Sequence, residues 1–308
     1  MASLLEIENV HQSFRVGFWM KRVEILRGVN LSVPDRSIFG FLGANGAGKT
    51  TLIHLIIGLR SPVQGTVQIR GLSARTREAR ARIGYLPERP YFHEHLTGEG
   101  LLRYFGGLAG LSASHLRDRI PRVLEQVGLK EAAKVELKRY SKGMLQRAGI
   151  AQAILHDPEF LVLDEPMSGL DPIGRKDVRE LILRLATEGR TIFFSTHVIP
   201  DVEAICDQVA LIAKGRLLGC GPVSGFLGTH GANRTEIVAG GLASDRASRV
   251  RGIAELRAIA DGWKAVADGS RDLSEILAEL IGSGAQIQSV NPIRPSLEGM
   301  FEAGATHR

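Results

Sequence analysis

The stretch that most constrains the fold is GFLGANGAGKTTLIHLIIGL, residues 40–59. Residues 43–50 fit the pattern G-x-x-x-x-G-K-[ST], and they lie between an apolar segment typical of a buried strand and one typical of a helix. In this context the backbone N–H groups of a glycine-rich turn and the N-terminus of the following helix surround an anion. We therefore expect this turn to hold a phosphate chain in an α/β fold.

Each position of this phosphate loop (residues 43–51) has an expected part. Lys49 should reach the β- and γ-phosphates, the Thr50 hydroxyl is placed to ligate Mg²⁺, and Thr51 is a further phosphate donor. The other residues bring their backbone close to the phosphates, and they are Gly43, Ala44, Asn45, Gly46, Ala47 and Gly48.

Two adjacent carboxylates follow a second apolar strand, in the sequence FLVLDEP. The carboxyl end of this strand places Asp164 near the metal and Glu165 one residue further towards the γ-phosphate. Adjacent carboxylates at a strand end can divide the work, so we expect Asp164 to organise Mg²⁺ and Glu165 to polarise the attacking water.

Hydrophobic patterning predicts how the chain is organised. The segments LLEIENV and VEILRGVNLSV alternate apolar and polar residues, which predicts antiparallel strands in the first 40 residues. From Ile38 onward, buried strands separated by helical segments predict a mostly parallel sheet with helices on both faces. A helical insertion is expected at about residues 97–155. Because the composition changes after residue 222, we expect one domain over residues 1–222 and a small α+β domain over residues 223–308.

Composition limits the class of protein. Of 308 residues, 44% are hydrophobic and 23% charged, which is typical of a globular chain with a sizeable core. The apolar stretches are shorter than the roughly 20 residues of a membrane-spanning helix, and the N-terminus lacks a signal-peptide pattern. Cys206 and Cys220 show no metal spacing and suit a reducing compartment, so we expect a cytosolic protein. The net charge of +6 alone selects no partner.

Further motifs follow the phosphate loop in order, and they are GYLPE (84–88), YSKGM (140–144), FLVLDEP (160–166), SGLD (168–171) and STH (195–197). Together they resemble the ATP-binding subunits of ATP-binding-cassette (ABC) transporters, over residues 4 to about 220. The signature segment YSKGM, followed by Gln146 and Arg147, is similar to the family signature, whose commonest form is L-S-G-G-Q. No other phosphate-loop family has this element between its two nucleotide motifs.

The resemblance implies a head-to-tail dimer in which each ATP lies between the phosphate loop of one subunit and the signature segment of the other. Ser141 and Gly143 would then face the γ-phosphate from the start of a helix. His197 matches the switch histidine that contacts the γ-phosphate, and Asp171 matches a loop that crosses the dimer interface.

Some positions depart from the common pattern of the family. Glu88 stands where many members have a glutamine that senses Mg²⁺ and the γ-phosphate; it keeps a ligating oxygen but adds negative charge. Lys142 and Met144 replace two usual signature residues. Together, YLPE and YSKGM look like the exporter-type branch whose membrane partners are ABC-2 type permeases.

Two basic or aromatic segments allow more than one interpretation. Phe14 best matches the aromatic residue that stacks on adenine, with Phe18 and Trp19 of the segment VGFWMKR (16–22) as alternatives. This segment could touch lipid headgroups, but we favour a hairpin tip close to the adenine. Four arginines could bind nucleic acid, but without interleaved aromatic residues we expect a solvated helix face at positions 75, 77, 80 and 82.

The tail after residue 222 has its own pattern, in which TEIVAGG, WKAVADG and AQIQSV read as short strands around two helices. The second helix should begin after Asp272, end at Gly282 and bury a face of Leu273, Ile276, Leu277, Leu280 and Ile281. The tail resembles the accessory domain of many exporter ATPases, which often ends in a phrase like PSLEGMF (295–301). A dimer-stabilising or lid element is favoured over a regulatory sensor.

The resemblance as a whole implies a subunit that binds and hydrolyses ATP with Mg²⁺, dimerises with itself or a related ATPase subunit, and energises transport through a separate ABC-2 type permease. We expect export, and a cytoplasmic protein held at the inner face of the cell membrane by that permease. The alternative is a soluble ABC ATPase acting on DNA or ribosomes, although the chain lacks the long coiled coil or second cassette of such proteins. A regulator without turnover is disfavoured because Glu165 and His197 are both present.

Overall fold

The structure is a computed structural model that describes residues 3–17, 20–228, 235–242, 247–248, 250–259 and 261–292. Phe18, Trp19 and the segment PSLEGMF therefore lie outside the described residues. The chain divides into two compact units, the first of which reaches Val223 and the second of which spans Ser224–Met300. In the described parts, no helix is both long and apolar enough to cross a membrane.

A mostly parallel sheet forms the centre of the first unit, with the strand order β10-β9-β3-β8-β7-β6. Strands β9 to β6 in this order pair in parallel, and β10 pairs antiparallel to β9. The bounds are β3 (Ile38–Gly43), β6 (Ile83–Leu86), β7 (Phe160–Leu163), β8 (Thr191–Thr196), β9 (Gln208–Ala213) and β10 (Arg216–Pro222). Successive residues of β7 enter different cores, with Phe160 and Val162 in one and Leu161 and Leu163 in the other. The sheet is therefore covered on both faces, as its apolar strands predict.

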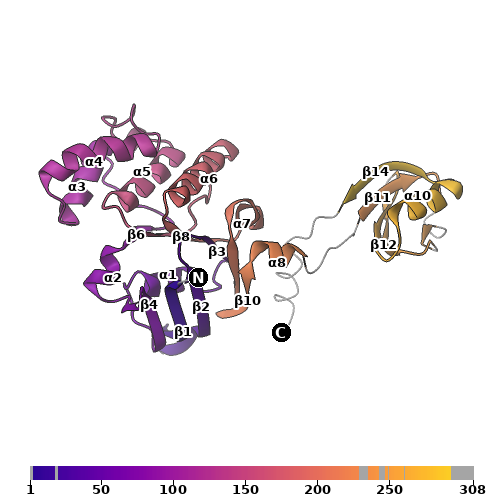
Figure 1. Cartoon of the computed structure of the whole chain (residues 1–308), viewed down its shortest axis with the longest axis horizontal. Coiled ribbons are helices and arrows are strands. Elements are labelled where there is room, and N and C mark those ends of the chain that lie inside the picture. The colour runs from indigo at the N-terminus through magenta and orange to yellow at the C-terminus, as the bar shows by residue number, and fades with distance from the viewer. Residues whose placement is uncertain are drawn as a thin grey trace. The chain divides into compact units, whose positions relative to one another are not determined.

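The first strands form a second, antiparallel sheet, as the alternating pattern predicts. Its order is β2-β1-β4-β5. The bounds are β1 (Ser3–Val16), β2 (Lys21–Pro34), β4 (Gln64–Ile69) and β5 (Leu72–Ser73). Because Val16 pairs with Lys21, residues 17–20 form the tip of the β1–β2 hairpin. This sheet and α1 (Lys49–Ile56) share a core with one face of the central sheet (Figure 1).

The helices on the other face come largely from the segment expected to be a helical insertion. They are α3 (Gly98–Leu108), α4 (Ala113–Gln126), the short 3₁₀ helix η1 (Leu137–Arg139), α5 (Lys142–Ile154) and α6 (Pro172–Thr187). Figure 1 shows α3 to α6 together on this side of the sheet. The remaining helices of the unit are α2 (Arg77–Ala81) and α7 (Ile199–Ile205), and α8 (Val223–Gly228) follows β10.

The arginines around α2 are mostly solvated, as expected. Arg75, Arg77 and Arg80 are exposed. Arg82 instead pairs with Glu78 and with Glu159, the residue before β7, so it helps to tie α2 to the central sheet.

The second unit is a four-stranded antiparallel sheet with the order β12-β13-β11-β14. Its bounds are β11 (Thr235–Gly240), β12 (Ile253–Ile259), β13 (Gly262–Ala267), β14 (Gln286–Pro292) and α10 (Leu273–Gly282). Asp272 caps α10, because its carboxylate accepts the N–H of Ser274 at 2.8 Å. Ile276 and Leu280 are buried against the sheet. Ile281 is 58% exposed, so its assignment to the buried face was wrong: it lies in the last turn of α10, beyond the buried stripe.

Strand β12 was not identified from the sequence. Ile253 and Leu256 both pack against the core of this unit although they are three residues apart, a spacing typical of a helix. A register shift between Ile253 and Glu255 explains this spacing, because a bulge moves the following residues to the opposite face. The first of the two predicted helices would fall between β11 and β13, where residues 243–246, 249 and 260 lie outside the described residues.

Candidate active site

The phosphate loop joins β3 to α1, as its sequence predicts. Gly48, the residue before α1, has a φ of 111°, a left-handed backbone that favours glycine. The N–H of Ala47 donates to the carbonyl of Ala44 at 3.1 Å and closes the turn. Helix α1 has no side-chain cap and no acidic residue in its first turn. Its first N–H groups are therefore available to an anion.

Lys49 is the first residue of α1 and is only 6% exposed. Its ammonium donates to the carbonyls of Gly43 at 2.7 Å and Ala44 at 3.3 Å. It also lies 3.1 Å from Oε1 of Glu165. Because a buried ammonium needs such partners, these contacts hold Lys49 across the loop, between β3 and the end of β7.

Asp164 and Glu165 follow β7, and Ser195 of β8 holds both. The Ser195 hydroxyl donates to Oδ1 of Asp164 at 2.6 Å, and it accepts the N–H of Glu165 at 2.9 Å. Asp164 is 1% exposed. Burial, with a smaller effect from the Asp164 charge, raises the pKa of Tyr85 in the neighbouring strand β6 to about 12. Tyr85 therefore stays neutral beside this carboxylate.

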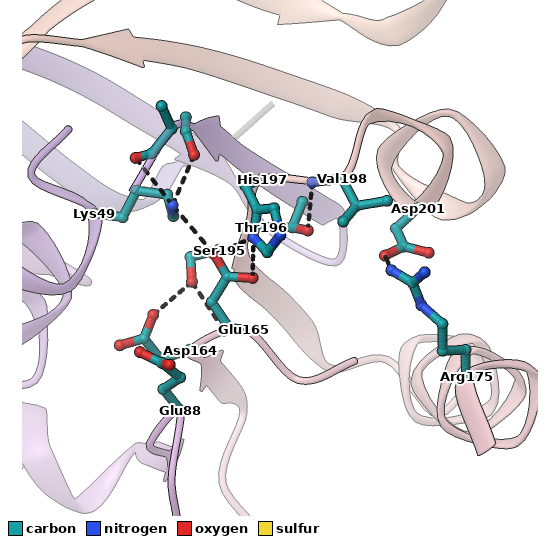
Figure 2. A network of polar contacts seen from close by, with 12 residues as sticks. Lys49, Glu88, Asp164, Glu165, Arg175, Ser195, Thr196, His197, Val198 and Asp201 are labelled. Carbon is teal, nitrogen blue, oxygen red and sulfur yellow. Dashed lines mark hydrogen bonds and ion pairs between the residues drawn. The ribbon is translucent and has the colours of Figure 1, made fainter. Parts of the chain in front are cut away.

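Glu165 lies between two basic groups. Its carboxylate faces Lys49 on one side, and on the other its two oxygens lie 3.2 and 3.0 Å from Nδ1 of His197. Figure 2 shows the three side chains converging from α1, β7 and β8. Glu165 has a φ of +48°, a left-handed backbone that typically costs about 1–3 kcal/mol in a residue other than glycine.

A cavity of about 470 Å³, here called the main cavity, lies over these groups. It brings together Lys49 and Thr50 of the phosphate loop with Glu88, Glu165 and His197. Of the other loop residues, its walls include Asn45, Gly46, Gly48 and Thr51. Gly43, Ala44 and Ala47 support the loop through their carbonyls. The Lys49 ammonium donates to the carbonyls of Gly43 and Ala44, and the N–H of Gly215 donates to the carbonyl of Ala47.

The donor set beside the loop fits Mg²⁺ better than a metal held by the protein alone. In the described residues, no three His, Cys, Asp or Glu side chains gather into a metal cluster. Mg²⁺ is usually bound through one or two carboxylates together with water and substrate phosphates. The Thr50 hydroxyl and the Glu88 carboxylate line the main cavity, and the Asp164 carboxylate, held by Ser195 outside the cavity lining, would complete such a set.

Phe14 is not brought to the main cavity. It lies on β1, paired with Val23, and the guanidinium of Arg60 lies 5.0 Å from the centre of its ring. The residue of this sheet that does line the cavity is Ile25 of β2, which the sequence analysis did not select.

The turn between β9 and β10 braces the phosphate loop. The N–H of Gly215 donates to the carbonyl of Ala47 at 3.1 Å, and its carbonyl accepts the N–H of Arg27 at 2.9 Å. Gly215 has a φ of +77°, and a Cβ there would lie 2.0 Å from the carbonyl oxygen of Ile25. Only glycine fits this approach, so Gly215 ties the loop to β2.

The signature segment lies at the start of α5, as predicted. Ser141 is the cap, and its hydroxyl accepts the N–H of Met144 at 3.2 Å. Ser141, Lys142 and Gly143 line a separate cavity of about 450 Å³, together with the SGLD loop. Asp171, at the end of that loop, caps α6 through the N–H of Gly174 at 3.0 Å. Within one copy of the chain, Ser141 and Gly143 are therefore not part of the main cavity.

Two further site residues escaped the sequence analysis as individual candidates. Ser168 lines the main cavity, and its N–H donates to the carbonyl of Glu165 at 3.0 Å. Ser195 organises the carboxylate pair. Ser168 lies in the motif SGLD and Ser195 in the motif STH, so membership of these motifs was the sequence feature that could have identified them.

Comparison with known proteins gives consistent matches. A family model described as ABC transporter matches residues 26–168. The chain is 41% identical over 303 residues to an uncharacterized ABC transporter ATP-binding protein of Nostoc sp., covering 97% of this chain and 89% of that protein. It is 32% identical over 308 residues to the bacitracin transport ATP-binding protein BcrA of Enterococcus faecalis, covering 98% and 96%. Among solved structures it is similar to cbiO1 of Clostridium perfringens, part of the ABC transporter complex cbiONQ, with a TM-score of 0.64, 26% identity and coverage of 72% and 89%.

Proposed function

The chain belongs to the family of ABC transporter ATP-binding proteins, and we propose that the main cavity is where it binds and hydrolyses ATP. It is the ATP-binding and ATP-hydrolysing subunit of an ABC transporter, a class of subunit that dimerises and acts with a membrane permease. The predicted ABC-type α/β fold and family are thus confirmed. The observation that carries the site proposal is the convergence of Lys49, Glu165 and His197 on one cavity beside the phosphate loop.

In this proposal the phosphate loop holds the phosphate chain of ATP. Lys49 donates to the β- and γ-phosphate oxygens, and the N–H groups at the start of α1 surround them. Thr51 donates its hydroxyl from the cavity wall. Thr50, Glu88 and Asp164 would hold Mg²⁺, which when bound neutralises charge on the β- and γ-phosphates.

Glu165 is the proposed base. Its carboxylate accepts a proton from water, whose oxygen then bonds to the γ-phosphorus as the bond to the β–γ bridging oxygen breaks. His197 keeps Nδ1 against Glu165 and leaves Nε2 for the γ-phosphate. The left-handed backbone of Glu165 and the Ser195 hydroxyl fix the direction of the carboxylate before substrate arrives.

A second copy of the chain completes the site. Ser141 and Gly143 lie outside the main cavity of their own copy, so we propose that they face the γ-phosphate held by the other copy. The α5 N-terminus supplies N–H groups and a positive dipole end for this contact. Phe14, which lies outside the main cavity, stays the proposed contact for an adenine that extends beyond that cavity. Residues 1–222 are the proposed ATP-binding domain and residues 223–308 the proposed accessory domain.

The finer identity of the transporter is also a proposal. We infer an ABC-2 type permease as partner, export as the direction and the inner face of the cell membrane as the location. The YLPE and YSKGM motifs and the relative named for bacitracin transport support this inference. The relatives described above give no support to action on DNA or ribosomes.

Cell fractionation with and without a candidate six-span permease tests the partner. The full chain should sediment with membranes only when the permease is co-produced, and Lys49→Ala should not abolish this association. Membrane association after deletion of every candidate permease would contradict the proposal. Tight, salt-sensitive binding to DNA or ribosomes would favour the soluble alternative.

A further inference from the structure

Asp201 is a buried acid beside the active site for which the mechanism above gives no role. It lies in the first turn of α7 and is 2% exposed. Two arginines of α6 neutralise it, Arg175 at 2.8 Å and Arg179 at 3.2 Å, and each keeps about a third of its side chain exposed. Because a buried carboxylate is costly unless it is paired, these contacts fix the position of Asp201 relative to α6.

The segment between His197 and Asp201 has few other anchors. The cap residue of α7, Val198, offers no side-chain hydrogen bond. Its N–H donates to the Thr196 hydroxyl at 3.0 Å, which fixes the turn but not its direction relative to α6. The contacts described for the His197 ring are both to Glu165, and its side chain is 44% exposed. Val202 and Ile205 pack α7 against the central sheet, and the Asp201 ion pairs are the polar tie that joins this segment to α6.

On the other side, Arg175 is tied to the loop that follows Glu165. The backbone N–H of Arg175 donates to the backbone carbonyl of Asp171, the residue that caps α6. The loop between them begins at Glu165, whose carbonyl accepts the N–H of Ser168. Arg175 is thus placed by the same segment that places Glu165.

These contacts close a ring. The chain connects Glu165 to Arg175 through the SGLD loop, and it connects Asp201 back to His197. Two contacts join these segments: the Arg175–Asp201 ion pair and the contact between the His197 imidazole and the Glu165 carboxylate. The ring surrounds a second cavity of about 250 Å³, whose walls include Ser168, Arg175, His197 and Asp201. Figure 2 shows the Arg175–Asp201 pair on the far side of His197 from Lys49.

We propose that Asp201, held by Arg175 and Arg179, is a positioning residue that sets His197 against Glu165 for ATP hydrolysis. It touches neither the phosphate loop nor the main cavity, so it acts on turnover rather than on nucleotide binding. Without the ion pair the segment after β8 can shift, and small misplacements of a reacting group cost about tenfold to a hundredfold in rate. The inference rests on the roles proposed for Glu165 and His197.

The test measures kcat and KM of the full chain for Asp201→Asn and Arg175→Gln. Asp201→Asn should lower kcat about tenfold or more with KM and ATP affinity within about twofold. Arg175→Gln should have a smaller effect in the same direction, because Arg179 remains. An unchanged kcat in Asp201→Asn would overturn the proposal, as would a rise in KM that accompanies the fall in kcat.

A matched control separates positioning from general stability. Arg70 bridges Asp35 and Glu159 at 2.8 and 3.1 Å, at the opposite ends of the central strands, and its exposure is close to that of Arg175. Arg70→Gln should lower the melting temperature while leaving kcat at the parent value. If Arg70→Gln lowers kcat as much as Asp201→Asn does, the effect is structural and the proposal fails.

A double variant gives the sharpest readout. In a His197→Ala background, Asp201→Asn should slow turnover by no more than about twofold further, because the group that it positions is gone. A full additional tenfold loss would show that Asp201 acts elsewhere. If Glu165→Gln and His197→Ala themselves turned over ATP at the parent rate, the proposed mechanism would fail; if they are slow and Asp201→Asn is not, only the positioning proposal fails.

Discussion

The ammonium of Lys49 lies 3.1 Å from the carboxylate of Glu165, although one residue begins α1 and the other follows β7. Both side chains are buried, so each lowers the cost of burying the other. The group proposed to bind the γ-phosphate and the group proposed to activate water are thus held in contact by the fold itself.

This contact predicts a non-additive loss of stability. Lys49→Ala should lower the free energy of unfolding by about 3 kcal/mol, because it leaves a buried carboxylate with His197 as its remaining basic neighbour. The double variant Lys49→Ala/Glu165→Gln should recover at least about 1 kcal/mol of this loss. Urea unfolding without nucleotide measures both. Additive effects within about 0.5 kcal/mol would contradict a coupled pair.

Glu88 should contribute to metal binding. Glu88→Gln removes one carboxylate beside the loop, so the Mg²⁺ concentration for half-maximal ATPase activity should rise roughly tenfold. A Mg²⁺ titration of phosphate release at saturating ATP measures this change. Glu94→Gln, at an exposed acid outside the main cavity, is the control and should leave the titration unchanged. Equal titrations for the parent and Glu88→Gln would exclude Glu88 from the metal site.

Gly215→Ala should weaken ATP binding by disturbing the turn that supports the phosphate loop. The added Cβ would meet the carbonyl oxygen of Ile25 at 2.0 Å, so the hydrogen bond from residue 215 to Ala47 has to move. We expect ATP affinity to fall on the order of tenfold. Gly189→Ala is matched, because Gly189 has a similar positive φ of +90° but open space around it. It should cost about 1–2 kcal/mol of stability and leave ATP affinity unchanged. Equal ATP affinities for the two variants would show that Gly215 does not support the phosphate loop.

Truncation after Gly228 should leave a folded protein that binds ATP but dimerises more weakly. Strand β10 ends at Pro222, and the N–H of Val223 still donates to Asp207 in the first unit. Every residue proposed for the site precedes this point. Nucleotide titration and light scattering of the truncated chain check the two parts separately. Loss of ATP binding in a folded truncation would place part of the site in the C-terminal region.

Local motifs account for what the sequence could predict. The phosphate loop, the β1–β2 hairpin and the Ser141 cap of α5 each depend on neighbours in the chain, so pattern and spacing suffice. Strand β12 was missed because a bulge gives its apolar residues a helical spacing.

Residues whose role depends on contacts between distant segments could not be identified from a local motif. Ser195 reads as one polar residue in an apolar strand, and only the pairing of β7 with β8 brings it to Asp164. Asp201 reads as an ordinary helix acid until α6 packs beside α7. Phe14 matches by position, yet the fold turns it to Arg60 rather than to the main cavity.

The oligomeric state of Glu165→Gln tests the central claim most directly. The change keeps the shape of the side chain but removes the charge that accepts a proton from water, so hydrolysis should slow about a hundredfold or more while ATP still binds. Because ATP is proposed to join Lys49 of one copy to Ser141 of the other, this variant should accumulate as a dimer with MgATP and not with MgADP. Lys49→Ala, which loses the phosphate contact itself, should stay monomeric.

Size-exclusion chromatography with light scattering, run beside a phosphate-release assay, gives both quantities. The account predicts a slow, ATP-dependent dimer for Glu165→Gln. Turnover at the parent rate would show that Glu165 is not the catalytic carboxylate, and a monomer at saturating MgATP would contradict a site shared between two copies of this chain.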